Sequence, residues 1–123
     1  MKWEKKGQLF DPRENTSDWI HNYAALPVCD LISEDLLRIY FSTRDAKGRS
    51  LPTFIEVSPK NPKNILKIHS KPILSLGAQG TFDDNGIMPS SIVDHDGKKY
   101  LYYIGWNPQV TVSYRLSIGL AIS

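Results

Sequence analysis

The chain has 123 residues, and its 15 basic and 13 acidic residues give a formal net charge of +2. The lysines and arginines are scattered along the sequence, so the charge gives no electrostatic case for binding nucleic acid. No apolar run approaches the roughly 20 residues that a membrane-spanning helix needs, and the N-terminus starts no apolar signal core. The single cysteine, Cys29, excludes an intrachain disulfide and a cysteine-based zinc site within one chain. Together these features predict a cytoplasmic protein with no membrane partner.

Short segments rich in β-branched and aromatic residues recur along the chain, separated by turn formers. Helical periodicity is scarce, and its best candidate, residues 33–41, fits a turn followed by a strand better than a helix. Residues 6–10 also alternate like a strand. The sequence therefore predicts an all-β fold. The other predicted strands, in chain order, are 38–42, 53–57, 65–68, 91–93, 100–104 and 118–122.

The sequence repeats with an offset of 62 residues. Pro27 and Pro89 each begin a predicted strand, and Tyr40 and Tyr102 each follow their proline by 13 positions (40 − 27 and 102 − 89). A repeated unit of four short antiparallel strands is typical of a propeller blade. We therefore expect an N-terminal strand and lead-in at 1–20, a first blade at 21–80 and an incomplete second blade at 81–123.

Propellers use about four to eight blades, so two blades predict a fragment of a longer chain. A fragment with open strand edges is expected to self-associate. Under the repeat His21 matches Asp83, since each precedes its proline by six residues. The innermost strand of each blade lines a central channel, and ligands bind at its mouth. We therefore expect these polar residues to face one axis.

Several motifs resemble the five-bladed propeller glycosidases, the superfamily of invertases, levansucrases, arabinanases, β-xylosidases and related mannoside phosphorylases. Phe-Asp-Asp-Asn-Gly at 82–86, Pro-Ser-Ser-Ile-Val at 89–93 and residues 96–103 are similar to the second blade of that family. Residues 25–28 with 37–45 are similar to its first blade. The resemblance covers about residues 19–123 and is greatest to an uncharacterised bacterial group.

The resemblance implies acid–base chemistry at a glycosidic bond, which needs paired carboxylates. It makes Asp83 the candidate catalytic carboxylate, and an acidic turn is the structural alternative. The family places another aspartate directly before the first-blade proline, where this chain has Leu26, and a glutamate in a third blade outside these residues. The second copy has Met88 at the position of Leu26. The resemblance therefore implies that this fragment is inactive alone.

Other polar and aromatic residues are candidates for binding the sugar, and each has a structural alternative. Asp84 and Asn85 fit a turn, and Arg44 fits a loop ion pair with Asp45 or a neighbour. Trp106 matches Arg44 under the repeat, and it fits a stacking platform or packing between blades. The predicted substrate-binding set is His21, Arg44, Asp45, Asp84, Asn85, Trp106 and Arg115.

No histidine pair has metal-ligand spacing, and residues 77–80 lack the following lysine of a phosphate-binding loop. We therefore predict no metal and no cofactor. The leading hypothesis is a glycosidase-like, carbohydrate-active enzyme with a saccharide substrate. The alternatives are a non-catalytic carbohydrate-binding propeller, a glycoside phosphorylase, or a structural fragment with no role of its own.

Overall fold

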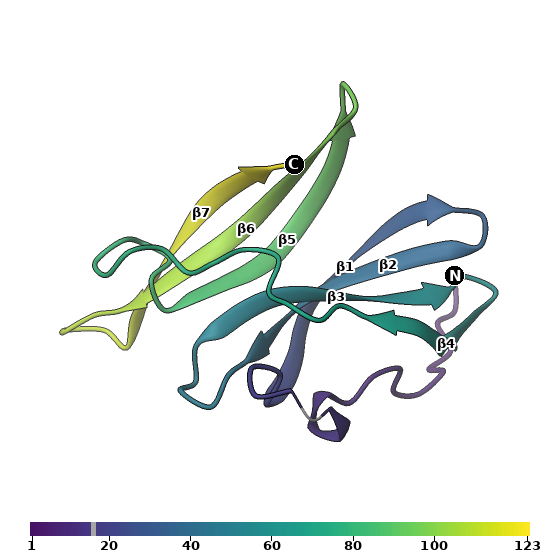
Figure 1. The fold of residues 1–123 in the computed structure, drawn as a ribbon, viewed down its shortest axis with the longest axis horizontal. Coiled ribbons are helices and arrows are strands. Elements are labelled where there is room, and N and C mark those ends of the chain that lie inside the picture. The colour runs from purple at the N-terminus through teal and green to yellow at the C-terminus, as the bar shows by residue number, and fades with distance from the viewer. Residues whose placement is uncertain (16) are drawn as a thin grey trace.

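A computed structural model describes residues 1–15 and 17–123, and its regular structure is strand apart from one short 3-10 helix, η1 (Pro12–Glu14) (Figure 1). The all-β prediction is therefore confirmed. The strands are β1 (Asn22–Ser33), β2 (Leu36–Arg44), β3 (Ser50–Ser58), β4 (Asn61–Ile68), β5 (Gly86–His95), β6 (Lys98–Pro108) and β7 (Tyr114–Ile122).

The strands form two antiparallel meanders, the first of β1–β4 and the second of β5–β7 (Figure 1). A single parallel pair, Ser50 with Gly86, joins β3 to β5 and makes one open seven-stranded sheet. The β5–β6 hairpin turns at Asp96 and Gly97, with φ angles of +48° and +72°. An Asp-Gly pair with two positive φ angles is favoured in two-residue hairpin turns.

All six short strands predicted from 38–42 onward lie within observed strands, but two starts were predicted too late. β1 begins at Asn22 and not at Pro27, and β5 begins at Gly86 and not at Pro89. The ladder shifts register between Ala25 and Val28 and again just after Pro89. Proline lacks the N–H that a regular ladder uses, so it is tolerated inside a strand at such bulges.

The strand predicted at residues 6–10 is wrong, because this segment forms no strand. Its Phe10 ring packs against Phe41, with ring centroids 5.4 Å apart. The segment therefore lies on a face of the first meander, where its backbone has no neighbouring strand to pair with.

The core occupies that face of the first meander. Ile39, Phe41, Ile55 and Val57 form one buried cluster, which Phe10 covers. The two meanders also contact each other: the Ser42 hydroxyl donates to the carbonyl of Ile87 at 3.1 Å. Lys99 of β6 reaches Asp30 of β1 at 2.8 Å. These contacts fix the second meander against the first and so define the gap between them.

Candidate functional site

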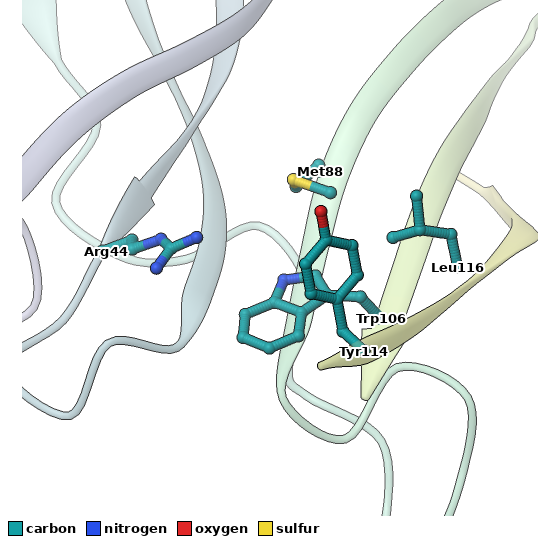
Figure 2. Close-up of a pocket in the computed structure, with 5 residues that line it drawn as sticks. All are labelled: Arg44, Met88, Trp106, Tyr114 and Leu116. Atoms are coloured by element: carbon teal, nitrogen blue, oxygen red, sulfur yellow. The ribbon is translucent and has the colours of Figure 1, made fainter. Parts of the chain in front are cut away.

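The candidate site is a pocket of about 400 Å³ between the meanders (Figure 2). Arg44, the last residue of β2, forms one side, and side chains of β5, β6 and β7 form the other (Figure 2). The lining is therefore one cation facing aromatic and aliphatic groups. The residues of the second side are Met88, Trp106, Tyr114 and Leu116.

The indole of Trp106 is held in place by its neighbours. Trp106 pairs with Gly86 on β5, and a Cβ atom at Gly86 would collide with the indole nitrogen. The ring of Tyr114 meets Trp106 edge-on, with centroids 6.2 Å apart and an interplanar angle of 69°. Among the described residues, Nε1 of Trp106 has no hydrogen-bond partner although it is buried. A glycine at 86 is thus what lets the indole lie against the start of β5.

Arg44 carries its charge between two aromatic rings. Its guanidinium carbon lies 5.2 Å from the centroid of Tyr23 and 5.6 Å from that of Trp106, both within cation–π range. The carboxylate next in sequence, Asp45, is engaged elsewhere. It accepts hydrogen bonds from the backbone of Lys47 and from Arg49, with which it also forms an ion pair at 2.8 Å.

The ion pair considered between Arg44 and Asp45 is therefore wrong, because Asp45 closes the β2–β3 hairpin. Burial alone would raise the pKa of Asp45, but the hydrogen bonds from Arg49 and Lys47 hold that pKa below its usual value. In the part of the chain that the structure describes, Arg44 makes no ion pair.

The start of β1 is strained where it approaches Arg44. Tyr23 and Leu26 have φ angles of +65° and +54°, in the left-handed region that non-glycine residues seldom adopt. The ladder shifts register on both sides of Ala25. Such outliers cluster at binding and catalytic sites. Both side chains are exposed. The Tyr23 ring lies within cation–π range of Arg44. Leu26, at the position where the resemblance expects an aspartate, presents an apolar group.

Asp83 is buried, with 8% of its surface exposed, and the hydroxyl of Tyr103 donates to one of its carboxylate oxygens at 2.9 Å. The hydroxyl of Thr81 lies 3.1 Å from the other oxygen and 2.7 Å from the carbonyl oxygen of Ala78, and its single proton serves one of the two. Gly77 makes room for this carboxyl group and Gly105 for the Phe82 ring and the Cβ atom of Asp83, since a Cβ atom at either glycine would collide with these groups. Burial and the bond to Asp83 raise the pKa of Tyr103 to about 12. Asp83 thus ties the linker between the meanders to β6.

Asp84 and Asn85 make local contacts in the same linker. The backbone N–H of Gly80 donates to Asp84 at 2.7 Å. The backbone of Asn85 accepts from Ser50 and donates to Trp106, at 3.1 and 3.2 Å. These bonds fix the entry to β5 and the position of Trp106.

The remaining two predicted residues lie apart from the pocket. His21 is exposed and borders a separate open pocket of about 670 Å³ that also involves Asp18, Asn22 and Ala46. Arg115 is exposed on β7, next to Leu116. Because side chains alternate along a strand, Arg115 lies on the opposite face of β7 from Leu116 and the pocket.

The structure therefore brings together Arg44 and Trp106, the pair that matches under the offset of 62. His21, Asp83 and Arg115 are not among the residues that line this pocket. The sequence interpretation missed the contribution of Tyr23, Tyr114 and Leu116. Tyr114, Leu116 and Ile118 occupy every second position. Extending that alternation back from the predicted strand at 118–122 would have found Tyr114 and Leu116.

Two further findings concern classes of site. No helix among the described residues is long and apolar enough to cross a bilayer. Residues 1–15 and 17–123 contain no cluster of three or more acidic, histidine or cysteine side chains that could hold a metal ion.

Comparison with known proteins finds two relatives of this chain. No family model matches the chain. Two uncharacterized proteins from two strains of Mycobacterium tuberculosis are each 45% identical over 123 residues. The match covers all of this chain, which spans 41% of the length of these relatives. No solved structure matches.

Proposed function

We propose that these residues form the first two blades of a five-bladed propeller that binds a saccharide in the Arg44–Trp106 pocket, and that the whole protein acts on a glycosidic bond. The observation that carries the proposal is the pocket itself. It lies between two repeated meanders, at the strand ends where a propeller channel opens, and it pairs a cation with aromatic rings.

An exposed apolar face on the second meander supports the fold part of this proposal. Tyr40, in the first meander, is 7% exposed, whereas its repeat equivalent Tyr102 is 41% exposed. Exposed apolar patches of this kind mark surfaces that another element covers. A third blade would face this surface as the second meander faces Tyr40 across a shared cavity. Beyond the pocket residue Leu116, alternate residues of β7 extend the patch: Ile118, Leu120 and Ile122.

The length of the relatives supports the blade number. A protein of which 123 residues are 41% has about 300 residues. Five repeats of about 62 residues would need about 310, and five lies within the range of about four to eight blades known for propellers.

The aromatic lining supports a saccharide as the ligand. The apolar C–H face of a sugar ring packs on an aromatic face, and Trp106 and Tyr114 offer two rings inclined at 69° to each other. Pockets of several hundred Å³ with few polar groups are typical of small-molecule sites.

The catalytic role of Asp83 stays a prediction. A carboxylate that acts on the bond needs a free oxygen within reach of the substrate, but Asp83 is buried and does not line the pocket. Asp83 would act only if its carboxylate, which Tyr103 binds, became accessible to the substrate. In this proposal, residues of further blades complete the pair of catalytic acid and base.

A second candidate function is a propeller that binds sugar without catalysis. The observation in its favour is Leu26, an exposed apolar residue where the glycosidase family places a carboxylate. Activity of the whole protein on aryl glycosides would exclude this candidate. Saccharide binding with no turnover, with and without phosphate, would establish it.

The proposal is tested by screening the protein against a panel of neutral and acidic oligosaccharides by saturation-transfer NMR. We expect binding that Trp106→Leu abolishes. The matched control is Trp3→Leu, because Trp3 is 88% exposed and lies outside the pocket. Binding that survives Trp106→Leu would place the sugar elsewhere, and no binding by any sugar would overturn the proposal.

A further inference from the structure

The charge of Arg44 is a feature that a neutral sugar does not explain. The chain has five arginines, and three of them hold a carboxylate: Arg13 pairs with Asp11, Arg38 with Glu56, and Arg49 with Asp45, at 2.6 to 2.8 Å. In the described residues, Arg44 and Arg115 have no such partner. Of these two, only Arg44 lies in a pocket.

We propose that the ligand of the Arg44–Trp106 pocket is an acidic saccharide, a sugar that carries a carboxylate, and that Arg44 binds that carboxylate. This inference rests on the proposed saccharide function and gives its substrate class. It follows from three features of the site: the unpartnered donors of the guanidinium in the described residues, the count of charges, and the strained approach of Tyr23.

The guanidinium of Arg44 can offer its N–H donors to a ligand. Its carbon atom lies over the rings of Tyr23 and Trp106, 5.2 and 5.6 Å from their centroids, within cation–π range. The N–H donors of a guanidinium point outward in its plane, in a fork that matches the two oxygens of a carboxylate. Among the described residues, the side chain of Arg44 donates no hydrogen bond to another group, so this fork is available to a ligand.

The number of charges favours a carboxylate over a phosphate. Arg44 is the one ionised group among the five residues that line the pocket, beside Met88, Trp106, Tyr114 and Leu116. One guanidinium balances the single charge of a carboxylate. A phosphate ester carries a charge of about −1.5 to −2 and would leave part of it uncompensated against an apolar wall.

The backbone at Tyr23 fixes this arrangement. A φ angle of +65° at a tyrosine is unfavourable, and it places the Tyr23 ring against Arg44. Gly86 does the same for the other ring, because any side chain there would displace the indole of Trp106. The two rings come from different strands, and Arg44 itself is exposed, so a ligand can reach its guanidinium.

The inference is tested with sugars that differ in one group. The protein is titrated with methyl glycosides of glucuronate and glucose, galacturonate and galactose, and mannuronate and mannose, and with glucose 6-phosphate, followed by saturation-transfer NMR. We expect at least one hexuronate to bind about 10-fold or more tightly than its neutral partner, the factor of a charge-assisted pair of hydrogen bonds. Added NaCl should reduce that preference because it screens the charge.

Variants then assign the preference to Arg44. Arg44→Gln should bring the hexuronate down to the affinity of the neutral sugar, and Arg44→Lys should keep part of the difference, because it keeps the charge but loses the fork. Arg115→Gln is the matched control and should change nothing, since Arg115 lies on the other face of β7. Circular dichroism checks that each variant is folded.

The outcomes separate this inference from the proposed function. Equal binding of acidic and neutral sugars, lost in Trp106→Leu, overturns the acidic ligand and leaves the saccharide site. Tighter binding of glucose 6-phosphate than of every hexuronate overturns the carboxylate. A preference that persists in Arg44→Gln overturns the role of Arg44, and no binding by any sugar overturns both proposals.

Discussion

The first and second meanders follow the same repeat, but they differ in what covers their faces. In the first, Phe10 closes one face over Phe41, and the other face, where Tyr40 is 7% exposed, lies across a shared cavity from the second meander. In the second, the face that carries Tyr102 is open, and Ile118 on it is 84% exposed.

The difference shows that each unit is buried by its neighbour more than by its own strands. Matched side chains that point back toward the preceding element, Ile39 and Leu101, are both 8% exposed. Matched side chains that point onward, Tyr40 and Tyr102, differ about sixfold in exposure. Repeat proteins bury each unit against the next in this way. The stability of these residues should therefore be concentrated in the first meander and in the contact between the two.

The largest effect is expected in the core of the first meander. Phe41→Ala removes a buried ring from the cluster and should lower the free energy of unfolding by about 3–5 kcal/mol. Ile118→Ala, on the open face, should change it by no more than about 0.5 kcal/mol. Urea unfolding of both variants measures the difference. Equal losses would mean that the open face is covered in solution.

The contact between the meanders gives the next effect. Lys99→Met leaves the buried carboxylate of Asp30 without its cation and should cost about 1–3 kcal/mol. The matched control is Lys60→Met, because the pair of Lys60 with Asp35 is fully at the surface and should contribute about 0–1 kcal/mol. The same urea unfolding experiment compares them. A loss for Lys60→Met as large as that for Lys99→Met would contradict the account of the interface.

Much of this comparison was predictable from the sequence, and some of it was not. Alternation and the offset of 62 predicted the strands, the two units and the match of Arg44 with Trp106, because these depend on local pattern. The positive φ angle of Tyr23 depends on how β1 bulges against its neighbour, which no local pattern encodes. The burial of Asp83 depends on Tyr103, 20 residues away, and on two glycines that make room for it.

The segment at residues 6–10 shows a further limit of prediction from the sequence pattern. Its alternation is typical of a strand, but it packs through Phe10 onto a face and not beside an edge. The sequence pattern indicates which side chains face an apolar surface. It does not indicate whether a partner strand is there to pair with the backbone.

The Asp83 network gives an effect that depends on pH. Tyr103 has a pKa of about 12 in the folded chain, above its usual value of 10.0, so ionisation favours the unfolded state. This contribution is complete below pH 10 and is lost as the pH rises toward 12. Tyr103→Phe should therefore reduce the decline of stability between pH 10 and 12 by about 1–2 kcal/mol. Thermal unfolding across this range measures it, with Tyr102→Phe as the exposed control. An unchanged decline in Tyr103→Phe would contradict the network.

The smallest expected change concerns association and not folding. The open face of the second meander should bring chains together at high concentration. Replacing Ile118 and Leu120 by lysine should lower the average mass in sedimentation while leaving the circular dichroism spectrum unchanged. The control variant, in which serine replaces Lys5 and Lys6, changes residues distant from that face. Equal mass for all three proteins, above that of one chain, would place the association elsewhere.

The saccharide site between the meanders is tested most directly by the fluorescence of Trp106. The chain has three tryptophans, and replacing Trp3 and Trp19 by phenylalanine leaves Trp106 as the sole indole reporter. We predict that an oligosaccharide from the panel shifts its emission, and that Arg44→Gln weakens the response to acidic sugars. A folded protein whose Trp106 emission is unchanged by every sugar would contradict the account.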